Sequence, residues 1–322
     1  MEINKETITD WLKNLQDSIC NSLEQADGAA KFEEENWIRN EGGGGRTRII
    51  KEGNVIEKGG VLFSAVSGDA PDFLFNEKEH SSSTSNLQSN ETKLKPQFFA
   101  TGVSIVIHPK NPMVPIIHMN IRYFEMPARA GGDGGVKWLG GGIDLTPHYI
   151  FENDAKFFHT QLKKVCDKHN LNYYSKFKKW ADDYFYINHR KETRGIGGIF
   201  FDRLNTDSES DSYRMSFEKN FAFWQDVGQA FAPIYVELIN RNKNKSFTEK
   251  NKQWQLLRRG RYVEFNLIYD KGTKFGLETN GRVESILMSL PKIAGWEYDF
   301  KTEKNSEEEK TLNLLKKDIA WA

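Results

Sequence analysis

The stretch GVSIVIHPKNPMVPIIHMNIRYFE, residues 102–125, contains two apolar runs that flank a proline-containing loop. Ile, Val, Phe and Tyr favour strands, whereas proline cannot donate a hydrogen bond to a sheet ladder. Pro109, Pro112 and Pro115 therefore mark the loop. We expect two neighbouring strands that pair antiparallel.

Successive side chains of a strand point to opposite faces, so the second strand separates into two sets. The apolar set, which we assign to the core, is Ile117, Met119, Ile121 and Tyr123. The polar set is His118, Asn120 and Arg122, and Ser104 and His108 share one face of the first strand in the same way. This polar face either lines a pocket or is a solvated face of an antiparallel sheet, and both interpretations stay open at this point.

Composition excludes several classes of protein. The chain of 322 residues is 38% hydrophobic, which is enough for a large packed core. Lys and Arg number 45, as do Asp and Glu, so no overall charge favours nucleic acid or an anionic membrane, and an anionic partner must be held by local arginines. With Cys20 and Cys166 as the two cysteines, a disulfide framework is excluded and a reducing compartment is favoured.

The N-terminal residues MEINKETITDWLKNL lack the apolar core of a secretory signal and are too acidic for a mitochondrial transit peptide. The sequence also contains no run of about 18 apolar residues, the length that spans a bilayer. We therefore expect a cytoplasmic location and no integral membrane association.

Apolar spacing and turn residues predict most elements. The expected helices are 6–23, ended by Gly28, then 153–165, 174–186, 215–239 with an interruption near Pro233, one containing 254–259, 285–290, and a tail helix over 306–321. The expected strands are short ones around Ile49, Val55, Val61 and Phe63, then 199–201, and 262–269, followed by a hairpin turn at 270–272 and a partner strand through Phe275 and Leu277. The polar residues 75–96 are expected to be a loop.

Three other features are candidate sites. The run EGGGGRTR is not followed by Gly-Lys-Ser/Thr, which argues against a P-loop. Arg48 remains a candidate for an anionic ligand, although a structural role is favoured for it. Asp144 follows Gly140–Gly142, which either let a ligand approach closely or precede a turn that Asp144 caps. His159 lies on a predicted helix, where a structural role is favoured over a ligand role.

Arginines near glycine turns are the remaining candidates. His189, Arg190 and Arg194 precede the turn before strand 199–201, and Arg282 precedes a short helix whose N-terminus favours anions. Guanidinium groups present a planar donor fork that matches carboxylates.

Four long stretches together resemble one family, the oxygen-dependent coproporphyrinogen III oxidases. They are GVSIVIHPKNPMVPIIHMNIRYFE, WLGGGIDLTPHY, KFKKWADDYFYINHRKETRGIGGIFFDRL and RYVEFNLIYDKGTKFGLETNGRVESILMSLP, in the same order and over most of the chain. Where the family often has Gly-Gly-Arg, this sequence has Asn280, Gly281 and Arg282. The polar insertion near Ser81 and the C-terminal tail resemble the family least.

The resemblance implies a single α+β domain over 1–322, with a large antiparallel sheet covered by helices on both faces. It implies a homodimer with the 262–297 region at or near the interface. It also implies a reaction of haem biosynthesis, in which two propionates of coproporphyrinogen III become vinyls, giving protoporphyrinogen IX. O2 is the co-substrate, CO2 is released, and no organic cofactor or nucleic acid is expected.

Residue by residue, the resemblance implies a role for each matching position. The substrate-binding positions are Ser104, Asn120, Ile121, Arg122, Asn280, Gly281 and Arg282. His118 would be the proton donor, and Asp144 would be the acidic residue beneath the pyrroles. His108, His118, His159 and His189 match histidines assigned in some members as divalent-metal ligands, although their sequence spacing is not that of a close ligand set.

Two other classes of function stay open on the sequence. One is a redox metal oxygenase built on the four histidines. The other is a tetrapyrrole-binding or chaperone protein without turnover. Metal analysis with chelation distinguishes the first, and oxygen consumption with stoichiometric CO2 release distinguishes the second.

Overall fold

The computed structural model describes residues 3–69, 97–127, 135–205, 215–278 and 281–322. Its centre is a seven-stranded sheet in the order β1-β2-β3-β4-β5-β6-β9, with every neighbouring pair antiparallel. The strands are β1 Glu33–Ile38, β2 Gly43–Lys51, β3 Ile56–Asp69, β4 Gln97–Pro109, β5 Ile116–Met126, β6 Val136–Thr146 and β9 Gly198–Leu204. A two-stranded hairpin, β7 Tyr186–Ile187 and β8 Glu192–Thr193, lies outside this sheet.

The strand pair predicted from residues 102–125 is confirmed as β4 and β5. Ser104 lies opposite Asn120, and Val106 lies opposite His118. The alternation also has the predicted direction, because Ile117, Met119 and Ile121 are completely buried. Pro147 follows β6 directly, as expected of a residue that cannot continue the ladder.

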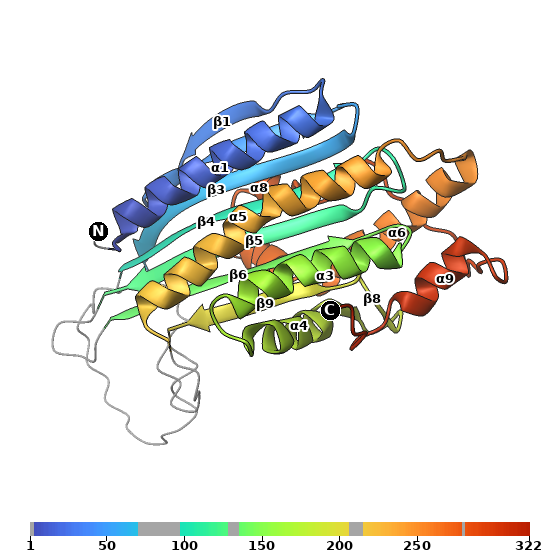
Figure 1. Cartoon of the computed structure of the whole chain (residues 1–322). Helices are drawn as coiled ribbons and strands as arrows, with labels where there is room; N and C mark the ends of the chain where they lie inside the picture. The colour runs from blue at the N-terminus through green and yellow to red at the C-terminus, as the bar shows by residue number, and fades with distance from the viewer. Residues whose placement is uncertain (1–2, 70–96, 128–134, 206–214, 279–280) are drawn as a thin grey trace, which may run out of the picture.

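One face of the sheet carries the main helices (Figure 1). These are α1 Lys5–Asp27, α3 Glu152–Asp167, α4 Tyr173–Tyr184 and α5 Phe217–Asn242. α1 packs on β3, α5 on β5 and β6, and α3 and α4 on β9. Helix α1 ends as predicted, because Gly28 adopts the left-handed conformation that a residue with a side chain disfavours.

The second face is covered in part by the C-terminal third of the chain, seen behind the strands in Figure 1. This layer contains α6 Glu249–Ile268, α7 Lys271–Glu278 and α8 Val283–Leu287. Tyr262 of α6 packs against Val106 and Ile116, and a Cβ at Gly60 would lie 2.3 Å from the sulfur of Met288. The α+β fold with helices on both faces of an antiparallel sheet is therefore confirmed.

The expected strand 262–269 is wrong, because these residues end helix α6. Tyr262, Phe265 and Asn266 are buried together, at the spacing of three and four that makes one helix face. The expected hairpin turn at 270–272 and the strand through Leu277 are also wrong, because α7 begins there. The carboxylate of Asp270 accepts a hydrogen bond of 2.7 Å from the Thr273 amide, so it caps a helix N-terminus.

Two helix boundaries also differ from the expectation. Helix α5 continues through Pro233, whose side chain lies on the solvent side of the helix. The tail helix is α9, Glu307–Leu314, and it ends before Trp321, which packs into the core. The loop predicted over 75–96 and the position of Asn280 fall outside the described residues. Within the part of the chain that the structure describes, no helix is long and apolar enough to cross a membrane.

Candidate active site

Ser104, Asn120 and Gly142 form the floor of the candidate site, on the sheet face away from α1 and α5. They lie side by side on β4, β5 and β6, because Asn120 is the register partner of both Ser104 and Gly142. Ser104 is exposed, whereas the Oδ1 atom of Asn120 is buried and has no hydrogen-bond partner among the described residues. Ser104 therefore offers an exposed hydroxyl to a ligand, whereas Gly142 is buried, and a Cβ there would lie 3.1 Å from the ring of Phe200.

His118 and Asp144 lie opposite each other at one end of this floor, on β5 and β6. His118 Nδ1 is 2.6 Å from Asp144 Oδ1, and the other oxygen of Asp144 accepts a hydrogen bond from Arg194. The Asp144 side chain is 3% exposed, whereas that of His118 is 19% exposed. A ligand on the floor would therefore meet His118 through Nε2, while Asp144 fixes the ring from beneath.

Arg194 reaches Asp144 from the segment that follows β8, and it is itself held in place. Its guanidinium carbon lies 4.2, 4.9 and 4.7 Å from the ring centroids of Phe185, Tyr262 and Phe265. Its Nη1 donates to Asn266 Oδ1 over 3.0 Å. A cation caged by aromatic faces and bonded to a buried carboxylate is strongly fixed in position.

The electrostatics of this group keep Asp144 ionised. Burial raises the pKa of the Asp144 carboxyl, but the positive Arg194 and the hydrogen bond from His118 outweigh it, so the pKa is lowered. Burial opposes the charge of Arg194 as well, but Asp144 holds the pKa of Arg194 above its usual value. Asp144 and Arg194 therefore each stabilise the charged form of the other.

Arg122 and Asp202 occupy the opposite end of the floor. Arg122 is four residues from His118 along β5, a distance of roughly 13 Å at the rise of a strand. Its side chain is 39% exposed, and its Nη2 lies 3.3 Å from Asp202 Oδ1. Gly140 makes this contact possible, because a Cβ there would lie 2.5 Å from Asp202 Oδ1 and 3.1 Å from Arg122 Nε.

Arg282 lies over a third edge of the floor, at the residue that precedes α8. Its Nη2 is 2.6 Å from Glu35 Oε1, and its Nη1 is 3.3 Å from the hydroxyl of Thr47 on β2. β2 and β5 are separated by three strand spacings, or about 14 Å. Arg122 and Arg282 thus place two guanidinium groups at separate edges of the floor, each paired with an acidic side chain.

The four histidines predicted as metal ligands are not brought together. His108 Nε2 is 2.8 Å from the Ser289 carbonyl, and His189 contacts Glu264. Both nitrogens of His159 are bonded, one to the Tyr174 hydroxyl and one to the Ile196 carbonyl, which matches the structural role favoured for it. Among the described residues, no group of three or more His, Cys, Asp or Glu side chains is arranged to hold a metal ion.

Burial keeps two of these histidines neutral. Burial, together with nearby Arg and Lys cations, lowers the pKa of His108 to about 3, against the opposing hydrogen bond that its ring donates to the Ser289 carbonyl. Burial likewise lowers the pKa of His159 to about 3.

Arg48, the other candidate for an anionic ligand, pairs with Asp17 and Glu34, so its role is structural. A hollow of about 760 Å³ between α1 and α5 lies on the other face and contains none of the predicted site residues.

Several residues of this site were not singled out in the sequence. Asp202 follows Phe200 at the spacing of one strand face, so alternation along β9 was an available signal. Tyr262 and Asn266 fall in the segment whose predicted strand is wrong, and their helical spacing of four residues was the available signal. Asn280 lies outside the described residues, and Gly281 lies beside Arg282, with its amide donating to the Gly276 carbonyl.

The fold and the site define an α+β protein that offers a histidine–carboxylate pair and two arginines to a ligand on one sheet face. The sequence matches the family of coproporphyrinogen III oxidases over residues 7–321. It is 42% identical to the oxygen-dependent coproporphyrinogen-III oxidase of Prochlorococcus marinus, over 99% of this chain and 93% of the relative. It is 47% identical to the chloroplastic coproporphyrinogen-III oxidase 1 of Arabidopsis thaliana, over 96% of this chain and 77% of the relative. The chain belongs to the coproporphyrinogen III oxidase family.

Proposed function

We propose that this chain catalyses the oxygen-dependent oxidative decarboxylation of coproporphyrinogen III, on the sheet face between His118 and Arg122. Family membership over nearly the whole chain supports the reaction. Two propionates become vinyls, giving protoporphyrinogen IX. Each propionate loses CO2, one proton and two electrons as its vinyl forms, and one O2 takes up the two electrons with two protons to leave as hydrogen peroxide.

The observation that carries the proposal is the spacing of charged groups around one flat floor. The substrate has four carboxylates, and Arg122 and Arg282 present guanidinium forks from two edges of the floor. Ser104, Asn120 and the backbone at Ile121 and Gly281 lie between or beside them. The macrocycle would rest on this floor with one propionate near His118.

His118 is the residue proposed to transfer a proton. Its Nδ1 faces Asp144, so Nε2 is the nitrogen that points toward a ligand. Asp144 was predicted to lie beneath the pyrroles, but both of its oxygens are already bonded to protein. We therefore assign Asp144 to orienting His118 and stabilising its charged form, instead of accepting the pyrrole N–H groups directly.

A divalent metal held by the four histidines does not fit the described arrangement, because the rings have separate partners. No step of the reaction is derived through a metal. For the carboxylates of the substrate, the arginines supply the positive charge. A cytoplasmic location stays a prediction, and the plant relatives are named chloroplastic.

A homodimer that uses the 262–297 region is part of the proposal. Six of the eleven large hydrophobic side chains found exposed in the described residues belong to this region. They are Leu267, Ile268, Leu277, Val283, Ile293 and Trp296. Such a concentration of exposed apolar side chains is typical of a protein interface.

Light scattering coupled to size exclusion tests the dimer. Leu267→Glu should produce the monomer, because it places a charge in the apolar surface. The matched control is Leu171→Glu, which changes an exposed leucine next to α4 and should leave the dimer intact. A monomeric wild-type protein would contradict this part of the proposal.

Turnover of coproporphyrinogen III in air and under argon tests the reaction itself. The purified protein should consume O2 and release two CO2 per protoporphyrinogen IX in air, and it should stop under argon. Binding of the substrate without CO2 release would favour the tetrapyrrole-binding alternative.

A further inference from the structure

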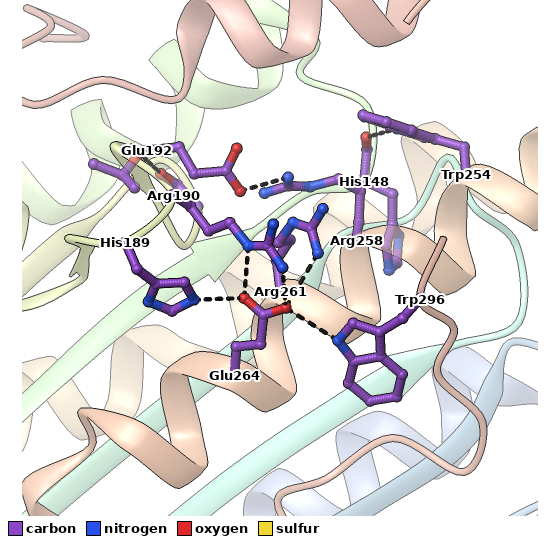
Figure 2. Close-up of polar contacts among 11 residues, drawn as sticks. His148, His189, Arg190, Glu192, Trp254, Arg258, Arg261, Glu264 and Trp296 are labelled. Carbon is purple, nitrogen blue, oxygen red and sulfur yellow. Dashed lines mark hydrogen bonds and ion pairs between the residues drawn. The ribbon is translucent and has the colours of Figure 1, made fainter. Parts of the chain in front are cut away.

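Glu264 of α6 lies where three segments of the chain meet, and four side chains donate hydrogen bonds to its carboxylate (Figure 2). Two donors, His189 and Arg190, belong to the turn between β7 and β8. Arg261 belongs to α6, and Trp296 to the segment after α8. The distances are 2.8 Å from His189 Nε2, 2.9 and 2.7 Å from Arg190 Nε and Nη2, 3.1 Å from Arg261 Nη1 and 3.0 Å from Trp296 Nε1.

The charge of Glu264 is needed at this junction. Its side chain is only 11% exposed, and burial raises the pKa of its carboxyl. The hydrogen bonds from Arg190 and His189 and the charge of Arg261 outweigh burial and lower the pKa to about 2. Repulsion from Arg190 also helps to lower the pKa of Arg261, after burial. Without the carboxylate, neighbouring cations would repel one another across the junction.

The turn that Glu264 holds leads directly into the candidate active site. β8 ends at Thr193, and the next residue is Arg194, which bonds Asp144. A second ion pair also joins the hairpin to α6, because Oε1 of Glu192 lies 2.7 Å from Nη1 of Arg258 (Figure 2). On α6, Asn266 is two residues after Glu264, and its Oδ1 accepts a hydrogen bond from Nη1 of Arg194.

We propose that Glu264 is a positioning residue for the reaction. It fixes the β7–β8 hairpin against α6, so that Arg194 meets Asp144 and Asp144 in turn orients His118. The inference rests on the proposed function of His118, but the contacts that carry it are those of Glu264. The bidentate Arg190 fork sets both the distance and the angle of the hairpin, which a single contact could not do.

Glu264→Gln tests this role, because it keeps the size of the side chain and removes its charge. Displacement of His118 should lower kcat about ten- to a hundredfold, as small misplacements of catalytic groups do. KM should change less than about threefold, because Arg122 and Arg282 are not part of the junction. The matched control is Asp226→Asn, which removes a carboxylate that holds Lys168 and His169 on the other face of the sheet, and its kcat should stay near that of wild type.

A double-mutant cycle separates positioning from general loss of structure. If Glu264 acts through Asp144, then Glu264→Gln should cost less than about twofold in kcat when Asp144 is already Asn. If the two losses multiply, Glu264 does not act through Asp144 and the proposal is wrong. Should Glu264→Gln fail to fold, Arg190→Lys carries the same comparison, since it keeps the charge and removes the fork.

A measurement without substrate keeps this inference distinct from the proposed reaction. The hydrogen-bonded Nδ1 proton of His118 should give an NMR resonance in wild type that is absent in His118→Gln. We expect this resonance to shift or broaden in Glu264→Gln and to stay unchanged in Asp226→Asn. An unchanged resonance in Glu264→Gln would overturn the positioning role even if the enzyme is active, and a shift would support it even if no turnover is found.

Discussion

His118 and Asp144 face each other across β5 and β6, with 2.6 Å between Nδ1 of the ring and Oδ1 of the carboxylate. The carboxylate is buried and paired with Arg194, whereas the ring reaches the open sheet face. Because the two residues are register partners of adjacent strands, the sheet brings them within reach of each other, and Arg194 holds the second oxygen of the carboxylate. The exposed member is the one that can exchange a proton with a ligand.

Asp144→Asn should lower kcat by about ten- to a thousandfold, while KM changes little, because the amide cannot stabilise a protonated His118. Circular dichroism should show an intact fold, since the substitution preserves size. Near-normal kcat in the Asn variant would mean that charge at this position is not used in the reaction. Asp144 lies inside β6 and does not cap a turn, so failure to fold would assign it instead to balancing the charge of the buried Arg194.

Arg122→Ala and Arg282→Ala should each raise KM about ten- to a hundredfold, because each removes a charge-assisted contact of roughly 1.5–3 kcal/mol with a propionate. Lysine at either position should restore binding only in part, since it lacks the bidentate fork. Arg48→Ala is the matched control, because Arg48 pairs with Asp17 of α1 and Glu34, away from the floor. Unchanged kinetics in both alanine variants would place the substrate elsewhere.

The sequence predicted the strands of the site better than the contacts between them. Alternation is a local property, so it assigned His118, Asn120 and Arg122 to one face of β5 without any knowledge of the fold. The pairing of His118 with Asp144 depends on the register between β5 and β6, which no residue of either strand specifies alone. Arg194 approaches from another element, 50 residues after Asp144 in the sequence.

The wrong strand prediction over 262–269 also assigned the side chains of Glu264 and Asn266 to the wrong directions. In a strand, Glu264 and Asn266 would point to the same face and could not hold the hairpin and Arg194 as they do from α6. Eight residues of mixed apolar and polar character fit a strand and a helix equally well, so packing decides between them. The buried contacts of Tyr262 and Phe265 with Arg194 stabilise the helix, and they are not visible in the local sequence.

Acid should destabilise the protein through its buried neutral histidines. The pKa of His108 and of His159 is about 3 in the folded protein, against about 6.5 for an ordinary histidine. The unfolded chain therefore binds more protons between these values, so stability is full above about pH 6.5 and falls as the pH is lowered toward 3. Each histidine should contribute at most about 1.4 kcal/mol per pH unit. Urea unfolding at several pH values measures the slope of the free energy of unfolding against pH. His159→Gln should reduce this slope, and an unchanged slope would mean that His159 is not the group responsible.

Removal of metals should leave turnover in air unchanged. The expectation follows from the separate partners of His108, His159 and His189, which the structure does not bring together with His118. Purified protein treated with a chelator should convert coproporphyrinogen III at the rate of untreated protein, and both samples should stop under argon. Activity that is lost on chelation and restored by one added metal would support the four-histidine site instead.

Gly140→Ala should weaken substrate binding without unfolding the protein. The added Cβ would lie 2.5 Å from Asp202 Oδ1 and 3.1 Å from Arg122 Nε. Both atoms belong to side chains that can move, so the fold should survive, but Arg122 would be turned away from its place at the edge of the floor. We expect KM to rise about tenfold, the same direction as Arg122→Ala, with kcat within about threefold of wild type.

A double variant tests whether this effect passes through Arg122. In the Arg122→Ala background, Gly140→Ala should have almost no further effect on KM, because both changes act on one contact. Independent, multiplying losses would show that Gly140 serves the approach of the macrocycle itself instead of the placement of Arg122.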